Sequence, residues 1–181
     1  MLQIGALQEA ATLFQEAKTL FNSLSPTSIN HWILEYNPIQ IRINDGLLSF
    51  AYSHYDVAMT HFRKSIDMLE SQYTETYNKQ DWMGPTVLRV DLYSTSLSNC
   101  WNNLALCALY TCRMQDAVRM METLVRRDPS RFLTERLAFN LSTLYELGSD
   151  AAASTRKKRV LQLIAKRFFL HDIGPESFRV S

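Results

Sequence analysis

Three short stretches of the chain share one spacing of small and large apolar residues. The stretches are GALQEAATLFQEA, SHYDVAMTHFRKS and CRMQDAVRMMETL. Their central alanines are Ala10, Ala58 and Ala117, and the large residues one turn later are Phe14, Phe62 and Met121. Steps of three and four residues place these side chains on one face of a helix. An alanine lets a neighbouring helix approach closely, so each stretch predicts a helix packed against a partner helix.

A second apolar helix is predicted upstream of the second and third stretches, and each carries an asparagine at a similar place. These asparagines are Asn44 and Asn103, and a further copy opens at Asn140. The repeating unit is therefore helix, short turn, helix, which is an antiparallel hairpin too small to bury its apolar face alone. Gly and Pro number only five each, so long helices can form without a breaker. The pattern predicts an all-α chain built as an α-solenoid of helical hairpins.

The copy that begins CWNNLALCALYTC resembles a tetratricopeptide repeat of 34 residues without a gap. The residues on that family's signature positions are Trp101, Leu104, Ala105, Ala108, Ala117, Met121, Leu124 and Pro129. Ala105 replaces the usual glycine, Ala108 the usual tyrosine and Leu124 the usual alanine. Pro129 bars Asp128 from continuing a helix, so the second helix should end there.

The repeats predict a single solenoid over residues 1–181. Its parts are a half repeat at 1–24, repeats at 39–77 and 91–130, a C-terminal capping hairpin at 132–169 and an irregular tail at 170–181. The alanines are 48 and 59 residues apart rather than 34, so we expect inserts at 25–38, with a short helix, and at 73–92, with a loop at 84–85. The first unit holds only its second helix, so the chain is expected to be a piece of a longer solenoid. Three apolar side chains should then lack cover: Leu7, Leu13 and Phe14.

Composition excludes several classes of function. The net charge is +1 and 46% of the residues are hydrophobic, so nothing indicates a nucleic-acid or membrane-surface protein overall. No apolar run approaches the roughly 18 residues of a membrane span. The first residues, MLQIGALQEA, lack the basic start and apolar run of a signal peptide. We therefore expect a cytosolic protein.

The three cysteines raise the possibility of a metal or redox site. Cys100 and Cys107 share a helix face and stand where tetratricopeptide repeats use alanine, while Cys112 falls at the turn between helices, where glycine is usual. Structural zinc sites favour pairs separated by two to four residues and need four ligands. The first gap holds six residues, and no histidine is near in sequence. We interpret Cys100 and Cys107 as small buried apolar residues.

Other candidate chemistry is weak. His54 and His61 share a helix face, but neither lies in a ligand motif, and we interpret both as surface or packed residues. The run at Arg156–Arg159 could contact an acidic lipid or partner, and we interpret it as a solvated helix start. None of the nucleophile, phosphate-binding or zinc-protease motifs occurs. We expect no enzymatic activity, no cofactor and no metal.

The first helix of each tetratricopeptide hairpin lines a concave groove in that family. By register, the groove residues here are Ile43, Leu47, Phe50, Asn102, Leu106, Leu109, Phe139 and Thr143. Members that bind the carboxylate end of a chaperone place lysine and asparagine where this chain has Ile43 and Leu47, or Asn102 and Leu106, so that role is disfavoured. A mostly apolar groove suits an amphipathic helix or another repeat protein.

A narrower resemblance rests on the stretch from Asn102 to Asp150, above all Asp128-Pro129, Glu135, FNLSTLYEL at 139–147 and the basic final helix from Arg156. The chain resembles the C-terminal tetratricopeptide region of the subunit 12 family of the transport protein particle (TRAPP) complex. The resemblance implies a non-catalytic scaffold within a vesicle-tethering complex that acts in ER-to-Golgi traffic and autophagy. It implies the large accessory subunits 11 and 8 as partners, with peripheral attachment to Golgi and intermediate-compartment membranes through the complex. The alternative is a stand-alone adaptor that binds a peptide or an amphipathic helix.

Overall fold

A computed structural model describes residues 6–24, 30–78 and 85–179, together with the side chains of all of them except 77, 78, 85 and 86. Within these ranges every regular element is helical, which confirms the all-α fold class. The chain divides into two compact units, residues 1–81 and 82–181, and each is described here by itself. No helix in the described ranges is both long and apolar enough to cross a membrane.

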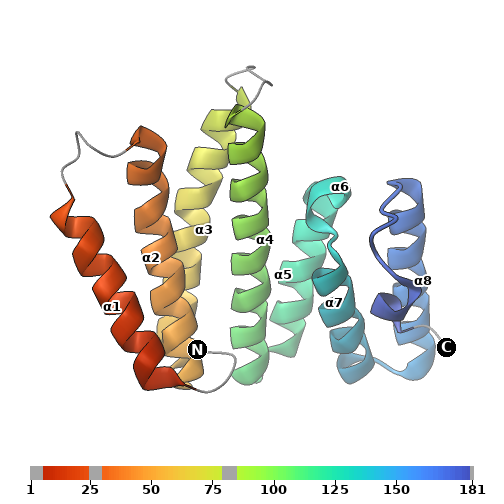
Figure 1. Ribbon diagram of the computed structural model, residues 1–181. Helices are drawn as coiled ribbons and strands as arrows, with labels where there is room; N and C mark the ends of the chain where they lie inside the picture. Colours follow the sequence, from red (N-terminus) through yellow and green to blue (C-terminus); the bar gives the residue numbers. More distant parts are fainter. Residues whose placement is uncertain (1–5, 25–29, 79–84, 180–181) are drawn as a thin grey trace. The chain divides into compact units, whose positions relative to one another are not determined.

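The first unit contains α1 (Leu7–Ser23), α2 (His31–Ala51) and α3 (Tyr55–Asn78). Helices α2 and α3 lie side by side as a hairpin, and α1 packs on α2 (Figure 1). The small residues set this packing. Gly46 of α2 is buried against the ring of Phe62 of α3, which is itself fully buried, and a methyl group on Gly46 would lie 2.8 Å from Cε1 of Phe62.

Two expectations about the first unit need correction or refinement. Residues 31–38 are not a separate short helix, because α2 runs through Pro38 without interruption. A proline inside a helix removes one backbone hydrogen bond, and its ring disfavours the helical conformation of the residue before it, so packing outweighs local preference here. On α1, Leu13 is 47% exposed, whereas Leu7 and Phe14 are half-buried.

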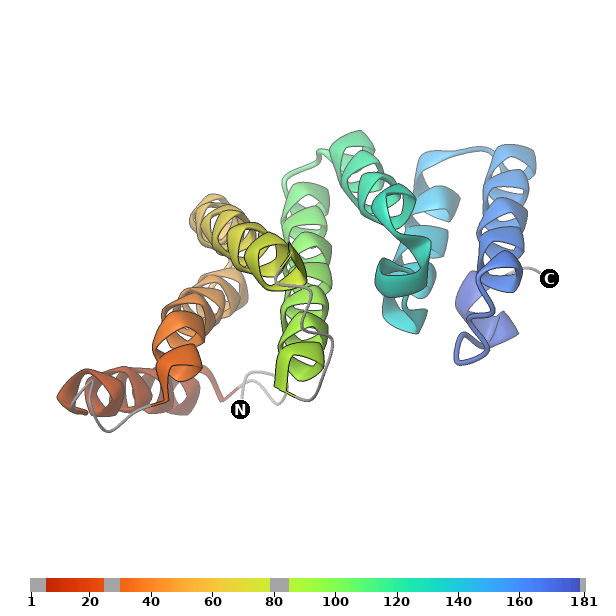
Figure 2. The ribbon, with the colours of Figure 1, turned by 90° about the horizontal axis from the view of Figure 1, so that it is seen from above.

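The second unit contains α4 (Pro85–Tyr110), α5 (Met114–Arg127), α6 (Pro129–Phe132), α7 (Glu135–Gly148), α8 (Ala151–Arg167) and a 3₁₀ turn, η3 (Pro175–Phe178). Successive helices pack as neighbours: α4 on α5, α5 on α7, and α7 on α8 (Figure 2). Helix α3 extends to Asn78 and α4 begins at Pro85, so the described parts of the expected insert are helical. The loop predicted at 84–85 is therefore wrong at Pro85, and Gly84 lies outside the described residues.

Side-chain caps fix where these short helices begin. The carboxylate of Asp128 accepts a hydrogen bond from the backbone N–H of Ser130 at 3.1 Å. The hydroxyl of Thr134 accepts one from Leu137, and the carboxylate of Asp150 accepts one from Ala153. Each cap satisfies a backbone donor that the first helical turn leaves unpaired. Helix α5 ends at Arg127, as the Asp128-Pro129 pair predicts.

The tail after α8 is predicted to be irregular, and within its described residues it contains one short regular element. Residues 175–178 form η3, and its side chains Ser177 and Phe178 are buried together with Ile173. Burial of Ile173 and Phe178 stabilises the packed position of this segment by roughly 1.5–3 kcal/mol for each side chain. The second unit therefore has a packed element after α8.

Three helices end in the same way. After α2, α4 and α8 one residue adopts the left-handed conformation, at φ 62° (Ser53), 60° (Cys112) and 55° (Phe169). In each case the next N–H bonds to a carbonyl five residues back, at distances of 2.9, 2.7 and 3.0 Å. This is the glycine-type helix end, made without glycine. Two of the turns lead into α3 and α5, and the third leads into the packed tail.

We expect Gly46→Ala to destabilise the first unit although alanine is the better helix former. Overpacking against Phe62 costs about 1–3 kcal/mol, which exceeds the gain in helix propensity of about 1 kcal/mol. Urea unfolding monitored by circular dichroism measures the change. The double variant Gly46→Ala with Phe62→Leu is the control, because the smaller side chain makes room for the methyl group. Purely additive effects of the two changes would contradict this account.

Cys112→Gly should instead stabilise the second unit. A left-handed conformation costs a residue with a Cβ about 1–2 kcal/mol, and glycine's extra chain entropy cancels about 0.5–1 kcal/mol of that gain. The expected net gain is about 0.5 kcal/mol in chemical unfolding. Cys112→Ala keeps the Cβ and should show no gain, so a stabilisation shared by both variants would point to the thiol rather than the backbone.

Candidate functional site

The eight predicted groove residues fall in both units. In the first unit Ile43 is buried, and Leu47 and Phe50 are half-buried. The ring of Phe50 lies 5.3 Å from that of Tyr55 in an edge-to-face contact across the α2–α3 turn. This face of α2 is therefore partly used by the hairpin itself, and Leu47 and Phe50 are the groove residues that keep exposed surface.

In the second unit the groove residues lie on α4 and α7. Asn102 is buried and accepts a hydrogen bond of 2.7 Å from the side-chain amide of Asn140. One turn earlier on both helices, Arg136 donates to Asn99 at 3.3 Å. The partner on α7 moves toward the C-terminus as the partner on α4 does, so the two helices run parallel. Polar side chains join them. Asn102 thus serves packing, and the surface left on α4 is formed by Leu106 and Leu109, which are half-buried.

The C-terminal segment lies over the predicted groove face of α7. Phe139 is 46% exposed, and the guanidinium of Arg179 lies 5.5 Å from its ring centre. The same guanidinium donates to the hydroxyl of Thr143 at 3.1 Å, and it lies 3.5 Å from the carboxylate of Glu146. Part of the face that the register assigned to a partner is therefore occupied by the chain's own tail.

Buried Lys158 anchors this segment. Its ammonium group donates to the carboxylate of Glu146 on α7 and, at 3.0 Å, to the backbone carbonyl of Arg179. The hydrogen bond from Lys158 lowers the pKa of Glu146, and the charges of Lys158 and Arg179 add to this effect. A buried cation with both partners in place is satisfied, whereas removal of one partner leaves it uncompensated.

Residue patterns alone did not identify this anchor. Lys158 stands in the run at 156–159, where four adjacent cations conceal which one points inward. The only sign of a packed tail was the pairing of Ile173 and Phe178 around Gly174-Pro175 in an otherwise polar segment. Two apolar residues after a helix can be either buried or exposed to solvent, so the sequence pattern does not predict which of these occurs.

Two cysteines are buried, as their positions in the repeat predict. Cys100 and Cys107 are fully buried, and Cys112 is exposed at the turn that follows α4. Burial raises the pKa of the Cys100 thiol to about 12. Since the thiolate is the reactive and metal-binding form, Cys100 is a poor nucleophile and a poor ligand.

The two histidines occupy different environments. His54 is exposed and its ring stacks near that of Tyr52 at 6.3 Å, while His61 is half-buried. In the ranges that the structure describes, no three His, Cys, Asp or Glu side chains come together in a way that could hold a metal ion.

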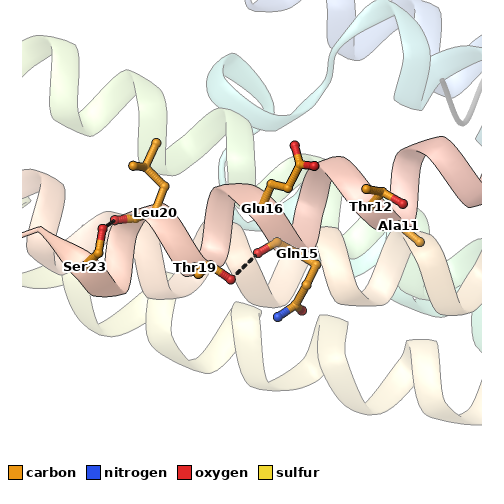
Figure 3. Close-up of a pocket in the computed structure, with 7 residues that line it drawn as sticks. All are labelled: Ala11, Thr12, Gln15, Glu16, Thr19, Leu20 and Ser23. Carbon is orange, nitrogen blue, oxygen red and sulfur yellow. Dashed lines mark hydrogen bonds between the residues drawn. The ribbon is translucent and has the colours of Figure 1, made fainter.

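A shallow hollow follows the outer side of α1, and every residue that lines it belongs to this one helix (Figure 3). The hydroxyls of Thr19 and Ser23 donate to carbonyls of their own helix, at 2.9 and 2.7 Å. Leu20 is 64% exposed beside them. A hollow with a single wall cannot enclose a small molecule.

A second hollow lies among α5, α7 and α8, with a base of Leu141, Leu161 and Ile164. On its rim the phenol of Tyr145 donates to the carboxylate of Glu122 at 3.0 Å. Burial raises the pKa of Tyr145, and the charge of Glu122 raises it further. The phenol therefore stays protonated and is not poised to act as a base.

Comparison with known proteins gives a consistent set of relatives. The chain is 36% identical over 167 residues to the trafficking protein particle complex subunit 12 of Mus musculus, covering 92% of this chain. It is 26% identical over 160 residues to the subunit of the same name from Homo sapiens, covering 88% of this chain. The chain spans only 17% of the length of each relative. No protein-family model and no solved structure matches.

The pH dependence of stability should report the anchor. A carboxyl whose pKa is lower in the folded than in the unfolded chain stabilises the fold above the unfolded value, about 4.3 for glutamate, and loses that effect as pH falls through the folded value. Glu146→Gln should therefore be less stable than the wild type at neutral pH, with a difference that shrinks as the medium becomes more acidic. Urea unfolding across this pH range tests it.

The matched control is Glu16→Gln, at an exposed position of α1, which should leave the stability of the second unit unchanged. A Glu146 variant with a constant deficit at every pH would show that the residue acts through packing rather than through its charge.

Proposed function

Because this chain is homologous over about nine-tenths of its length to a region of TRAPP complex subunit 12, we propose that it is a component of a TRAPP-type vesicle-tethering complex. The identity of 36% across 167 residues is the observation that carries the proposal. The relatives are named as subunits of a trafficking particle, so the role expected for this chain is attachment to other subunits rather than catalysis.

The proposed architecture is an α-solenoid of tetratricopeptide-type hairpins. Parallel α4 and α7, joined at Asn99–Arg136 and Asn102–Asn140, support it. The partners in these two hydrogen bonds are 37 and 38 residues apart, close to the 34-residue repeat of the family. The matching turns after α2 and α4 support it further. In such an array each hairpin presents its first helix to a partner.

The proposed partners are the large accessory subunits 11 and 8, and the proposed setting is ER-to-Golgi transport and autophagy on the cytosolic side of these membranes. The candidate contact surface is the part of α4 and α7 that the tail leaves free, namely Leu106, Leu109 and the exposed edge of Phe139. Apolar side chains of this kind, half exposed on helices, suit the apolar face of a partner helix.

A tagged copy of the chain, purified from cells and analysed by mass spectrometry, distinguishes this role from that of a stand-alone adaptor. A tethering subunit should recover a large complex in constant ratio, and that complex should contain the other TRAPP subunits. Recovery of one unrelated protein through a short linear segment would instead establish the adaptor.

The double variant Leu106→Asp with Phe139→Asp should lose this co-purification. Burial of each side chain at an interface contributes roughly 1.5–3 kcal/mol, and the new carboxylates would be unpaired there. Helical circular dichroism and cooperative melting must be retained for the loss to be informative. Phe139→Asp alone is the milder variant, because Phe139 is exposed and Arg179 lies beside it to pair with the new charge.

Leu147→Asp is the matched control, since Leu147 is 60% exposed on the same helix but is not a predicted groove residue. A folded double variant that recovers the complex in full would place the partner surface elsewhere, with Trp82 of the expected 73–92 insert as the next residue to change.

A further inference from the structure

The outward face of α8 combines exposed cations with exposed aliphatic side chains. At 100° per residue, positions 156, 159, 160, 163, 166 and 167 fall within roughly a third of the helix circumference. Arg156, Arg159, Lys166 and Arg167 are exposed, and between them Val160 and Leu163 are 54% and 65% exposed. Ser154, Lys158, Leu161 and Ala165 are buried and occupy the opposite side.

The buried residues of α8 face the rest of the second unit, and Val160, at the edge of the outward face, also lines the hollow among α5, α7 and α8. Helices α6 and α7 and the turn η3 contact α8, and α7 lies beside it (Figure 2). Arg159, Lys166 and Arg167 take part in no hydrogen bond or ion pair within the described part of the chain. Helix α8 contains six Lys and Arg residues and no Asp or Glu. The nearest acids in sequence, Asp150 and Asp172, lie beyond its two ends.

Helix stability does not account for this face. Cations in the last turn, Lys166 and Arg167, interact favourably with the helix dipole. The helix dipole does not explain Arg159, which lies in the middle of the helix. It does not explain Val160 and Leu163 either, since polar residues at these exposed positions would leave the helix equally stable. The adjoining Phe169 is 75% exposed and holds a left-handed conformation where its counterparts are Ser53 and Cys112. The ring of Phe169 lies 6.2 Å from that of His171, and this contact leaves most of the phenylalanine exposed.

We propose that the outward face of α8, together with Phe169, is a docking surface for an anionic lipid bilayer. Lys and Arg have long flexible stems, so their charged ends can reach lipid phosphates while Val160 and Leu163 dip between them. A protein partner would need a matching pocket for each projecting side chain, whereas a bilayer has no fixed shape. The ridge from Arg156 to Arg167 is only about 16 Å long, which suits weak, reversible attachment alongside other contacts of a complex.

Sedimentation with phosphatidylcholine vesicles, with and without phosphatidylserine, tests the proposal on the whole chain. Binding should require phosphatidylserine and should weaken as salt rises. If the wild-type protein does not sediment with phosphatidylserine-containing vesicles at low salt, the proposal is overturned.

Charge variants locate the surface. Arg159→Gln with Lys166→Gln should weaken vesicle binding roughly 25-fold, because each cation near an anionic surface contributes about a fivefold factor. The control is Arg119→Gln with Arg126→Gln on α5, which removes the same net charge from residues already paired with Asp116 and Glu122. Equal losses in the two double variants would show that only net charge matters and would overturn the assignment to α8.

Apolar variants separate a bilayer from an acidic protein. Leu163→Ser should weaken vesicle binding without lowering the melting midpoint. Phe169→Gly should weaken it while the midpoint rises, since glycine relieves the left-handed strain. Poly-glutamate serves as the acidic polypeptide probe. Tight poly-glutamate binding that needs the cations but not Leu163, with no vesicle binding, would assign the face to an acidic protein instead.

Discussion

The close approach of paired helices at small residues is the constraint on which the rest of this chain depends. Gly46 faces Phe62 in one hairpin, and Ala108 and Ala117 are fully buried in the other. A larger side chain at any of these positions would separate the helices and open voids beside the large apolar residues. With the hairpins fixed, the turns at Ser53 and Cys112 must accept a left-handed backbone, because only a tight reversal returns the second helix onto the first.

The same constraint explains which parts of the fold could be predicted from sequence. The spacing of small residues predicts α3, α5 and their hairpin partners, because the same small residues that set the spacing allow the paired helices to approach closely. Pro38 misled the prediction because a proline usually marks a helix boundary, yet α2 buries Ile39 and Ile43 just beyond it and keeps its course. The packed tail was missed for the opposite reason. Ile173 and Phe178 belong to no repeating pattern, and their burial depends on a surface that only α7 and α8 together create.

The candidate surface shows why register alone does not define a binding face. Helical spacing assigns Asn102, Leu106 and Leu109 to one side of α4, but it does not reveal that Asn102 is used by Asn140. A polar residue on the first helix of a hairpin can contact either a binding partner or the next helical unit. The hydrogen bond from Asn140 places Asn102 in contact with α7. On α7, Arg179 of the tail contacts Phe139 and Thr143, so the chain itself uses part of this face. The surface proposed for a partner is therefore narrower and more apolar than the eight residues that the register predicts.

The basic run at residues 156–159 shows how one sequence feature can carry two unrelated physical roles. A run of four cations in a chain of net charge +1 reads as a solvated surface. Helical geometry divides it, because successive residues point 100° apart. Lys158 points inward, where it is buried and satisfied by Glu146 and the Arg179 carbonyl, while Lys157 turns sideways with its ammonium 4.7 Å from the Tyr145 ring. Arg156 and Arg159 point outward beside Val160 and Leu163. Lys158 therefore holds the tail against α7, whereas Arg156 and Arg159 face solvent. The net charge of the run does not distinguish the buried cation from the exposed ones.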